Sequence, residues 1–222
     1  MPHTALHKDL FPSLTVIQHP LIQDKLAHMR MKSTEKVTFR ALLDQISSLM
    51  AFEVTRCLPL KNIEIETPLD LCTAHVVSQP CVLVAILRAG LGMMTGFLNV
   101  LPHAQEAHIG LSRNAVSKQS QQYLTKIPTF KGQKFFILDP MLATGNSAIK
   151  AVEILKEHKI AEENIVFVSL IAAPEGVQNF QGSFPNIPIF TASLDAGLDG
   201  NAYIVPGMGD VGDRLFGTEA DH

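Results

Sequence analysis

Short apolar runs alternate with helix-length segments in the second half of the chain. The runs are CVLVAIL at 81–87, KFFIL at 134–138 and IVFVSLI at 165–171. Runs that are apolar at almost every position are typical of parallel strands buried on both faces. The segments between them, at 92–101 and 146–158, carry apolar residues at helical spacing. The pattern predicts βαβ units, and therefore an α/β fold built on an open, mostly parallel sheet with flanking helices.

Two amphipathic helices are predicted before the first of these strands. The first starts at Pro20 and places Leu21, Leu26 and Met29 near one face. The second has Thr34 as its N-cap, and the apolar residues of 37–50 follow helical spacing.

An antiparallel hairpin is predicted after the second helix. Residues 62–67 alternate polar and apolar, with Ile63 and Ile65 on one face. This alternation indicates a strand with one wet face, paired with residues near Val76.

The two ends of the chain differ from this pattern. Residues 1–14 show no periodicity, so we interpret them as an N-terminal arm, and 15–222 as a single domain. From residue 194 onward the chain is rich in Gly and Asp. Such a composition predicts extended, turning structure in place of a terminal helix.

Composition excludes several classes of function. The 222 residues carry 18 Lys+Arg and 21 Asp+Glu, a net charge of −3. Nucleic-acid-binding proteins instead carry an excess of basic residues. No apolar run approaches the ~20 residues that span a bilayer. The sequence shows no secretory signal, so we expect a cytoplasmic protein with no membrane or nucleic-acid partner. The three cysteines, Cys57, Cys72 and Cys81, match no metal or disulfide spacing, and no metal site is predicted.

In an open parallel sheet, ligands bind beyond the carboxyl ends of the strands, so the segments after the apolar runs are the candidate sites. The segment Asp139–Ser147 follows KFFIL and leads directly into a helix. A strand, a turn with Thr144 and Gly145, and a helix N-terminus together predict a phosphate site. The same residues are equally consistent with a simple turn and a helix cap.

Arg88 follows CVLVAIL and stands beside Gly90 and Gly92, where it could clamp an anion. Taken alone, it fits a glycine-rich turn with an arginine that reaches solvent. Arg113 precedes a polar stretch, 115–122, that we interpret as a mobile surface loop. An ordinary polar connection fits the same residues.

In the tail, 204–213 contains Gly207, Gly209 and Gly212. An open backbone of this kind suits a planar heterocycle with alternating donors and acceptors. A purely structural loop is the alternative.

Taken together, these segments closely resemble the uracil phosphoribosyltransferases. The matching residues are His19-Pro20-Leu21, Lys25-Leu26, Met29-Arg30, ILRAGLGMM (86–94), DPMLATGNS (139–147), AAPEG (172–176), YIVPG (203–207) and Gly209-Asp210. They extend over about nine tenths of the chain. The resemblance implies a phosphoribosyltransferase-type sheet with a hairpin arm, and a small base-binding hood formed by 194–222.

The resemblance also implies the roles of individual residues. Arg88, Arg113, Asp139 and Asp210 would be catalytic. The residues that would bind phosphoribosyl diphosphate (PRPP) are Arg88, Arg113, Asp139, Pro140, Met141, Leu142, Ala143, Thr144, Gly145, Asn146, Ser147 and Asp210. Uracil would contact Ile204, Gly209, Asp210 and Val211.

The implied reaction is the conversion of uracil and PRPP to UMP and diphosphate. Mg²⁺ is expected to arrive mainly on PRPP, and the resemblance implies GTP as an allosteric activator and a homodimer or homotetramer. Two residues depart from the family pattern: Asn146 replaces a usual glycine and Val211 a usual alanine. The alternatives are a PRPP- or nucleotide-sensing regulator with little turnover on the same fold, and an enzyme that uses another base.

Overall fold

A mostly parallel sheet forms the centre of the molecule in the computed structural model, which describes residues 10–113 and 120–218. Its strands are β1 (Leu14–Val16), β4 (Cys81–Leu87), β5 (Gln105–Arg113), β6 (Ser120–Lys126), β7 (Lys134–Leu138), β8 (Met141–Leu142), β9 (Ile165–Ala172) and β10 (Ile189–Leu194). They lie in the order β1-β10-β9-β7-β4-β5-β6, and β8 pairs with β9. Every pairing is parallel except that of β5 with β6. The predicted α/β fold is confirmed.

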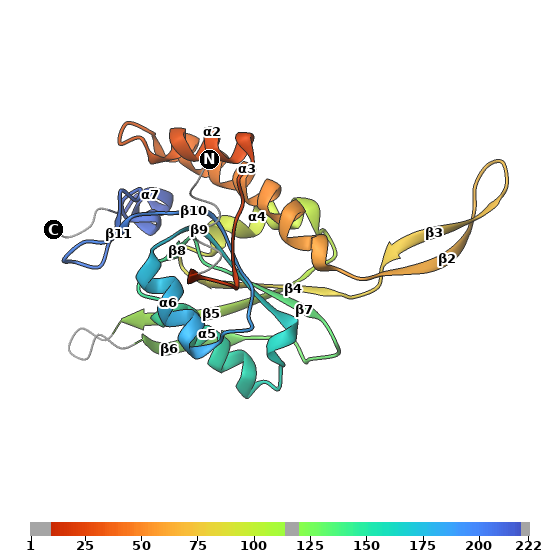
Figure 1. The fold of residues 1–222 in the computed structure, drawn as a ribbon. Helices are drawn as coiled ribbons and strands as arrows, with labels where there is room; N and C mark the ends of the chain where they lie inside the picture. Colours follow the sequence, from red (N-terminus) through yellow and green to blue (C-terminus); the bar gives the residue numbers. More distant parts are fainter. Residues whose placement is uncertain (1–9, 114–119, 219–222) are drawn as a thin grey trace.

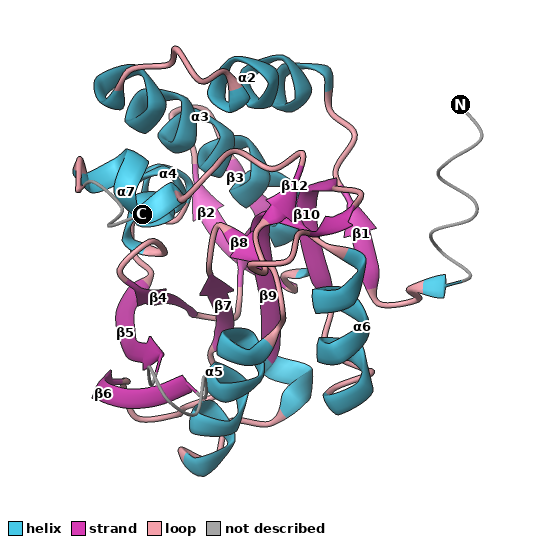
Figure 2. Cartoon of the chain, turned by 90° about the vertical axis from the view of Figure 1, so that its left-hand side faces the viewer, coloured by secondary structure: helices cyan, strands magenta, loops and turns pink. Residues whose placement is uncertain are grey.

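Helices cover both faces of this sheet. They are α2 (Pro20–Arg30), α3 (Lys36–Val54), α4 (Leu91–Val100), α5 (Asn146–Glu157), α6 (Pro174–Ser183) and α7 (Val211–Phe216), with short 3₁₀ turns at Thr55–Cys57 and Glu162–Asn164. In Figure 1, α2, α3 and α4 lie above the sheet, whereas α5 and α6 lie below it. Figure 2 shows α7 beside the upper group.

The side chains of the central strands alternate between two hydrophobic cores. In β4, Leu83 and Ala85 belong to the core between the sheet and α2, α3 and α4. Val82, Val84 and Ile86 belong to the core between the sheet and α5 and α6. All five are buried, because a strand covered on both faces exposes neither row of side chains to water. This is the physical reason for the unbroken apolar runs.

The two N-terminal helices form as predicted, but their details differ. In α2, the buried face consists of Ile22, Leu26 and Met29, and Leu21 is 53% exposed. Thr34 is not the N-cap of α3, which begins at Lys36; its hydroxyl donates to the carbonyl of His28 instead. The hydroxyl therefore ties together the turn between the helices.

The predicted hairpin consists of β2 (Leu60–Glu66) and β3 (Leu71–Val77), with Lys61 opposite Val76. This hairpin arm extends away from the body of the molecule (Figure 1). The prediction of a single wet face is wrong, because no residue of either strand is buried. Leu69 at its tip is 97% exposed.

Three further segments differ from the sequence-based expectations. Leu14, assigned to the N-terminal arm, pairs with Ile189 and opens β1. Ser120–Gln122, assigned to a polar loop, belongs to β6, while 114–119 lie outside the described residues. The glycine-rich tail contains the short helix α7, which had been excluded. Asp210 caps α7 by accepting a hydrogen bond from the Asp213 N–H, and this capping offsets the poor helix propensity of Gly212.

In the part of the chain that the structure describes, no helix is both long and apolar enough to cross a bilayer. The cysteines are free, with Cys81 buried and Cys57 and Cys72 exposed.

Candidate active site

The candidate site lies at the end of β4 and β7, two neighbouring strands whose following connections run in opposite directions across the sheet. The chain passes from β4 to β5 on one side, and β7, β9 and β10 continue on the other. Such a switch point leaves a crevice at the carboxyl ends of the strands. A cavity of about 430 Å³ opens there. It is lined by Arg88, Ala89, Asp139, Met141, Ala143, Ser147, Asn201, Ala202, Tyr203, Ile204, Gly209, Asp210, Val211 and Gly212.

The segment from Asp139 to Ser147, which we call the phosphate loop, connects β7 to α5. Asp139 follows the last residue of β7, and its N–H donates to the carbonyl of Val168 in β9 (3.1 Å). Leu142 is buried under α5 and α6 and anchors the middle of the loop. Gly145 is the N-cap of α5, so the loop ends where the first N–H groups of the helix have no partner within the helix. This arrangement can bind an anion.

Helix α6 holds the other side of the phosphate loop. The Asn179 side-chain amide donates to the Thr144 carbonyl (2.8 Å) and to the Asn146 side-chain oxygen (3.1 Å). Gly176 allows this approach, because a Cβ at that position would lie 2.3 Å from the carbonyl oxygen of Ala143. Asn179 of α6, together with the close packing at Gly176 of the AAPEG motif, thus supports the phosphate loop.

Asp139 is partly buried, and its environment disfavours the charged form. Burial raises the pKa of this carboxyl to about 7, and a long hydrogen bond from the Met141 N–H (3.4 Å) opposes the shift only weakly. An ionised Asp139 is therefore a strong acceptor for hydroxyl groups of a ligand, because few protein donors satisfy it.

The two predicted arginines are placed differently. Arg88 is exposed at the end of β4, with its guanidinium 5.3 Å from the ring centroid of Phe216 in α7. It lines the cavity together with Asp139 and also reaches solvent, so its role as an anion clamp stays a prediction. Arg113 is the last residue of β5, and its side chain lies outside the described part of the structure.

The C-terminal hood supplies the opposite wall of the cavity. Its strands β11 (Gly197–Leu198) and β12 (Ile204–Val205) are antiparallel, and Glu175 of α6 accepts a hydrogen bond from the Leu198 N–H (3.1 Å). Val211 begins α7 and is buried, with one side of the residue at the cavity. The hood therefore brings backbone groups of the tail to face the phosphate loop.

Arg214 fixes α7 against the N-terminal helices. Its guanidinium donates to the carbonyls of Met29, Met31, Thr34 and Met208, and stacks 4.3 Å from the ring centroid of Phe39. A planar guanidinium suits this combination of donors and ring stacking. These contacts join α7 to α2, to the turn that follows α2 and to α3, on one side of the site.

Most of the predicted site residues meet at this cavity. Those that line it are Arg88, Asp139, Met141, Ala143, Ser147, Ile204, Gly209, Asp210 and Val211. Pro140, Leu142, Thr144, Gly145 and Asn146 shape the phosphate loop without lining the cavity. The sequence analysis missed Ala89, Asn201, Ala202, Tyr203 and Gly212. Tyr203 could have been noticed as an aromatic residue directly before the predicted base-binding segment.

Among the described residues, no group of three or more His, Cys, Asp or Glu side chains could hold a metal ion. Asp139 and Asp210 nevertheless both line the cavity. One or two carboxylates plus substrate phosphates are a usual environment for Mg²⁺. The donor set therefore fits a magnesium ion that arrives with its phosphate ligand.

An open sheet, a phosphate loop and a hood over the same cavity define the class. The fold is that of the phosphoribosyltransferases: adenine phosphoribosyl transferase from Trypanosoma brucei superimposes with a TM-score of 0.56 at 11% identity, over 91% of this chain and 90% of that one. The AQ2163 protein from Aquifex aeolicus is more similar, with a TM-score of 0.87 and 32% identity over 93% of this chain and 99% of that one.

Sequence comparison then gives the family. The family model for uracil phosphoribosyltransferase matches residues 16–218. Proteins named uracil phosphoribosyltransferase are 50% identical in Rhodospirillum centenum, over 96% of this chain and 99% of that protein, and 47% identical in Ralstonia pickettii, over 94% and 97%. The chain belongs to the uracil phosphoribosyltransferase family, a family of pentosyltransferases, and the predicted resemblance is confirmed.

Proposed function

We propose that this protein transfers the phosphoribosyl group of PRPP to uracil, giving UMP and diphosphate. The observation that carries the proposal is the cavity itself. Its lining combines the phosphate loop, which suits the ribose and 5′-phosphate, with the open backbone of the hood, which suits a planar base. The reacting C1′ carbon would lie between these two walls.

In this reaction the N1 atom of uracil forms a bond to C1′, and the C1′–oxygen bond breaks. Diphosphate leaves with the electron pair, and the N1 proton passes to solvent. Arg88 at the cavity would stabilise the negative charge that grows on diphosphate, and Arg113 at the end of β5 is proposed to assist. Asp139 would accept hydrogen bonds from the ribose hydroxyls. No covalent intermediate on the protein is required.

Asp210 and the backbone at Ile204, Gly209 and Val211 are proposed to recognise uracil, with Asp210 also in reach of PRPP. Mg²⁺ bound to PRPP would neutralise part of the diphosphate charge, and Asp139 and Asp210 are the carboxylates at hand to hold it. Backbone groups are fixed in direction, so they can select uracil by its pattern of donors and acceptors.

The test is an assay with PRPP, Mg²⁺ and one nucleobase at a time. Uracil should yield UMP, whereas adenine, guanine and hypoxanthine should not react. Faster turnover of a purine than of uracil would contradict the assignment. Binding of PRPP without turnover of any base would support a regulatory protein instead.

The hairpin arm supports a further proposal, that the protein is a homodimer or a larger homo-oligomer. Its exposed apolar residues are Leu60, Ile65, Leu69, Leu71 and Val77. A two-stranded hairpin is marginally stable by itself in water, and exposed apolar surface of this kind marks interaction sites. Sedimentation equilibrium measures the assembly directly, and a monomer at micromolar concentration would contradict it.

GTP activation and a cytoplasmic location are proposed from the family resemblance. Initial rates with and without GTP test the first, and cell fractionation tests the second. A rate that does not respond to GTP would remove the regulatory part of the proposal and leave the catalytic part intact.

A further inference from the structure

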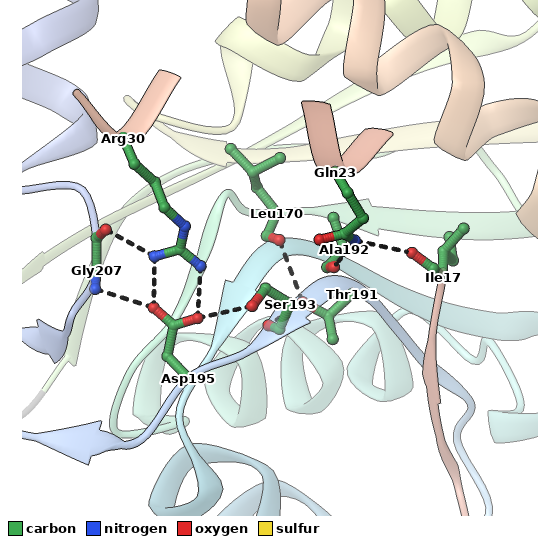
Figure 3. Close-up of polar contacts among 9 residues, drawn as sticks. All are labelled: Ile17, Gln23, Arg30, Leu170, Thr191, Ala192, Ser193, Asp195 and Gly207. Atoms are coloured by element: carbon green, nitrogen blue, oxygen red, sulfur yellow. Dashed lines mark hydrogen bonds and ion pairs between the residues drawn. The ribbon is translucent and has the colours of Figure 1, made fainter. Parts of the chain in front are cut away.

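An ion pair outside the cavity holds the hood. Arg30, the last residue of α2, donates from Nη1 to Oδ2 of Asp195 (2.7 Å) and from Nη2 to Oδ1 (2.6 Å). Asp195 follows β10, and its side chain is only 2% exposed, against 22% for Arg30. Figure 3 shows the two side chains facing each other in a bidentate pair.

The same two side chains form hydrogen bonds with both polar backbone groups of Gly207. The Gly207 N–H donates to Oδ2 of Asp195 (2.9 Å), and its carbonyl accepts from Nη1 of Arg30 (2.7 Å) (Figure 3). Gly207 has a φ of +60°, and a Cβ there would lie 2.0 Å from the carbonyl oxygen of Ile204. The turn between Ile204 and Gly209 is therefore both tight and fixed from outside.

Asp195 has its hydrogen-bonding capacity filled. Ser193 donates its hydroxyl to Oδ1 (2.7 Å), in addition to the two bonds from Arg30 and the one from Gly207. Burial disfavours the charge, but the bonds from Arg30 and Ser193, the Arg30 charge and the Gly207 N–H together lower the pKa of Asp195 below its usual value. A buried carboxylate with all its hydrogen bonds made holds its partners rigidly.

Other contacts besides this pair attach α2 to the body of the molecule. Ile22, Leu26 and Met29 bury the inner face of the helix, and the Gln23 side-chain amide donates to the carbonyls of Ala192 and Ile17 (2.8 and 3.3 Å). What Arg30 adds is the contact with Gly207. Neither Arg30 nor Asp195 nor Gly207 lines the cavity, whereas Ile204 and Gly209 on either side of Gly207 do.

We propose that Arg30 and Asp195 are positioning residues for uracil: they hold Gly207 so that the backbone of Ile204 and of 209–211 is set at the spacing that the base requires. The inference rests on the proposed function, since it needs uracil to bind at this segment. It predicts that loss of the pair changes the KM for uracil and has little effect on the KM for PRPP. The loop proposed to bind PRPP lies on the other wall of the cavity.

The test uses Arg30→Lys, Arg30→Gln and Asp195→Asn in the full-length protein, with steady-state kinetics for each substrate. We expect the KM for uracil to rise roughly tenfold in Arg30→Gln and Asp195→Asn, while the KM for PRPP stays within about twofold. Arg30→Lys keeps the charge but cannot make all three contacts, so it should lie between these variants and the wild type. Arg56→Gln is the matched control, because it removes an exposed ion pair with Glu53.

Equal increases in both KM values, or unchanged kinetics in folded variants, would show that the pair is only a structural anchor. Amide hydrogen exchange of the wild-type protein can still overturn the inference if a variant fails to fold. The Gly207 amide should be protected, and exchange as fast as in an exposed loop would overturn the inference. Wild-type protein that does not use uracil would instead refute the proposed function, so the two failures are distinct.

Discussion

The ionised Asp139 side chain, which has a proposed role at the site, lowers the stability of the folded protein. Burial raises its pKa from 3.8 to about 7, so between these pH values the folded protein binds a proton that the unfolded chain has released. The free energy of unfolding therefore falls as pH rises through this range, and the loss is complete above about pH 7. If Asp139 accepts hydrogen bonds from the ribose hydroxyls as proposed, the ionised carboxyl costs the ligand-free protein stability that the bound ligand can restore.

Asp139→Asn should therefore stabilise the ligand-free protein at pH 8, and this gain should vanish as the pH is lowered toward 4. Thermal melts of both proteins across this range measure the effect. The same variant should lower kcat/KM for PRPP at least about tenfold, because charge-assisted hydrogen bonds to hydroxyls are worth about 1.5–3 kcal/mol. A variant with normal PRPP kinetics would show that Asp139 is only a turn residue.

Val211 stands where the family resemblance implies an alanine, and the structure buries its side chain beside the cavity. Val211→Ala should cost about 1–2 kcal/mol of stability by leaving a small void. The ratio of the turnover rates with uracil and 5-fluorouracil should be the same in this variant as in the wild type. Val205→Ala is the control, since Val205 is 46% exposed. Better use of 5-fluorouracil with no loss of stability would place the side chain in the base pocket instead.

At the scale of elements, the close contact of α6 with the phosphate loop allows a paired test. Gly176→Ala puts a methyl group 2.3 Å from the Ala143 carbonyl, whereas a Cβ at Gly182 in the same helix meets nothing within 4 Å. Gly176→Ala should lower the melting temperature and raise the KM for PRPP. Gly182→Ala should raise the melting temperature slightly through the better helix propensity of alanine. Identical behaviour of the two variants would contradict the role given to α6.

The elements that the sequence predicts well are those whose pattern reflects burial on both sides. β4, β7 and β9 are apolar at almost every position because helices cover both faces of the sheet. The helix-length segments predicted between them correspond to α4 and α5. The segment Asp139–Ser147 runs from the end of β7 into α5 as predicted, whereas phosphate binding by it stays a prediction. Its position depends only on the end of β7 and the start of α5.

The elements that were missed depend on distant partners. β1 has three residues, and its pairing with β10 makes it a strand. α7 contains a glycine and relies on the Asp210 cap, and Arg214 ties it to α2 and α3. Likewise, the motif pair Met29-Arg30 was recognised in the sequence, but its contact with Gly207 spans 177 positions and no local pattern could reveal it.

At the scale of the whole molecule, the hairpin arm gives a prediction for the proposed assembly. If a second copy covers the arm, the melting temperature should rise with protein concentration, because association stabilises only the folded state. Leu71→Lys should abolish that dependence and reduce the mass measured by sedimentation. Val37→Lys, on an exposed position of α3, is the control and should change neither. A concentration-independent melting temperature in the wild type would argue against the arm as an interface.

The sheet separates two cores, and each core supports one wall of the cavity. Ile204, Met208 and Val211 of the hood belong to the core shared with α2, α3 and α4. Leu142, Ala148 and Val177, around the phosphate loop, belong to the core under α5 and α6. Met141 and Ala143 of the phosphate loop also pack against the first core, so the two layers share that part of the cavity. Repacking the layer of α2, α3 and α4 should therefore change the choice of base more than the binding of the phosphoribosyl donor, which rests mainly on the other layer.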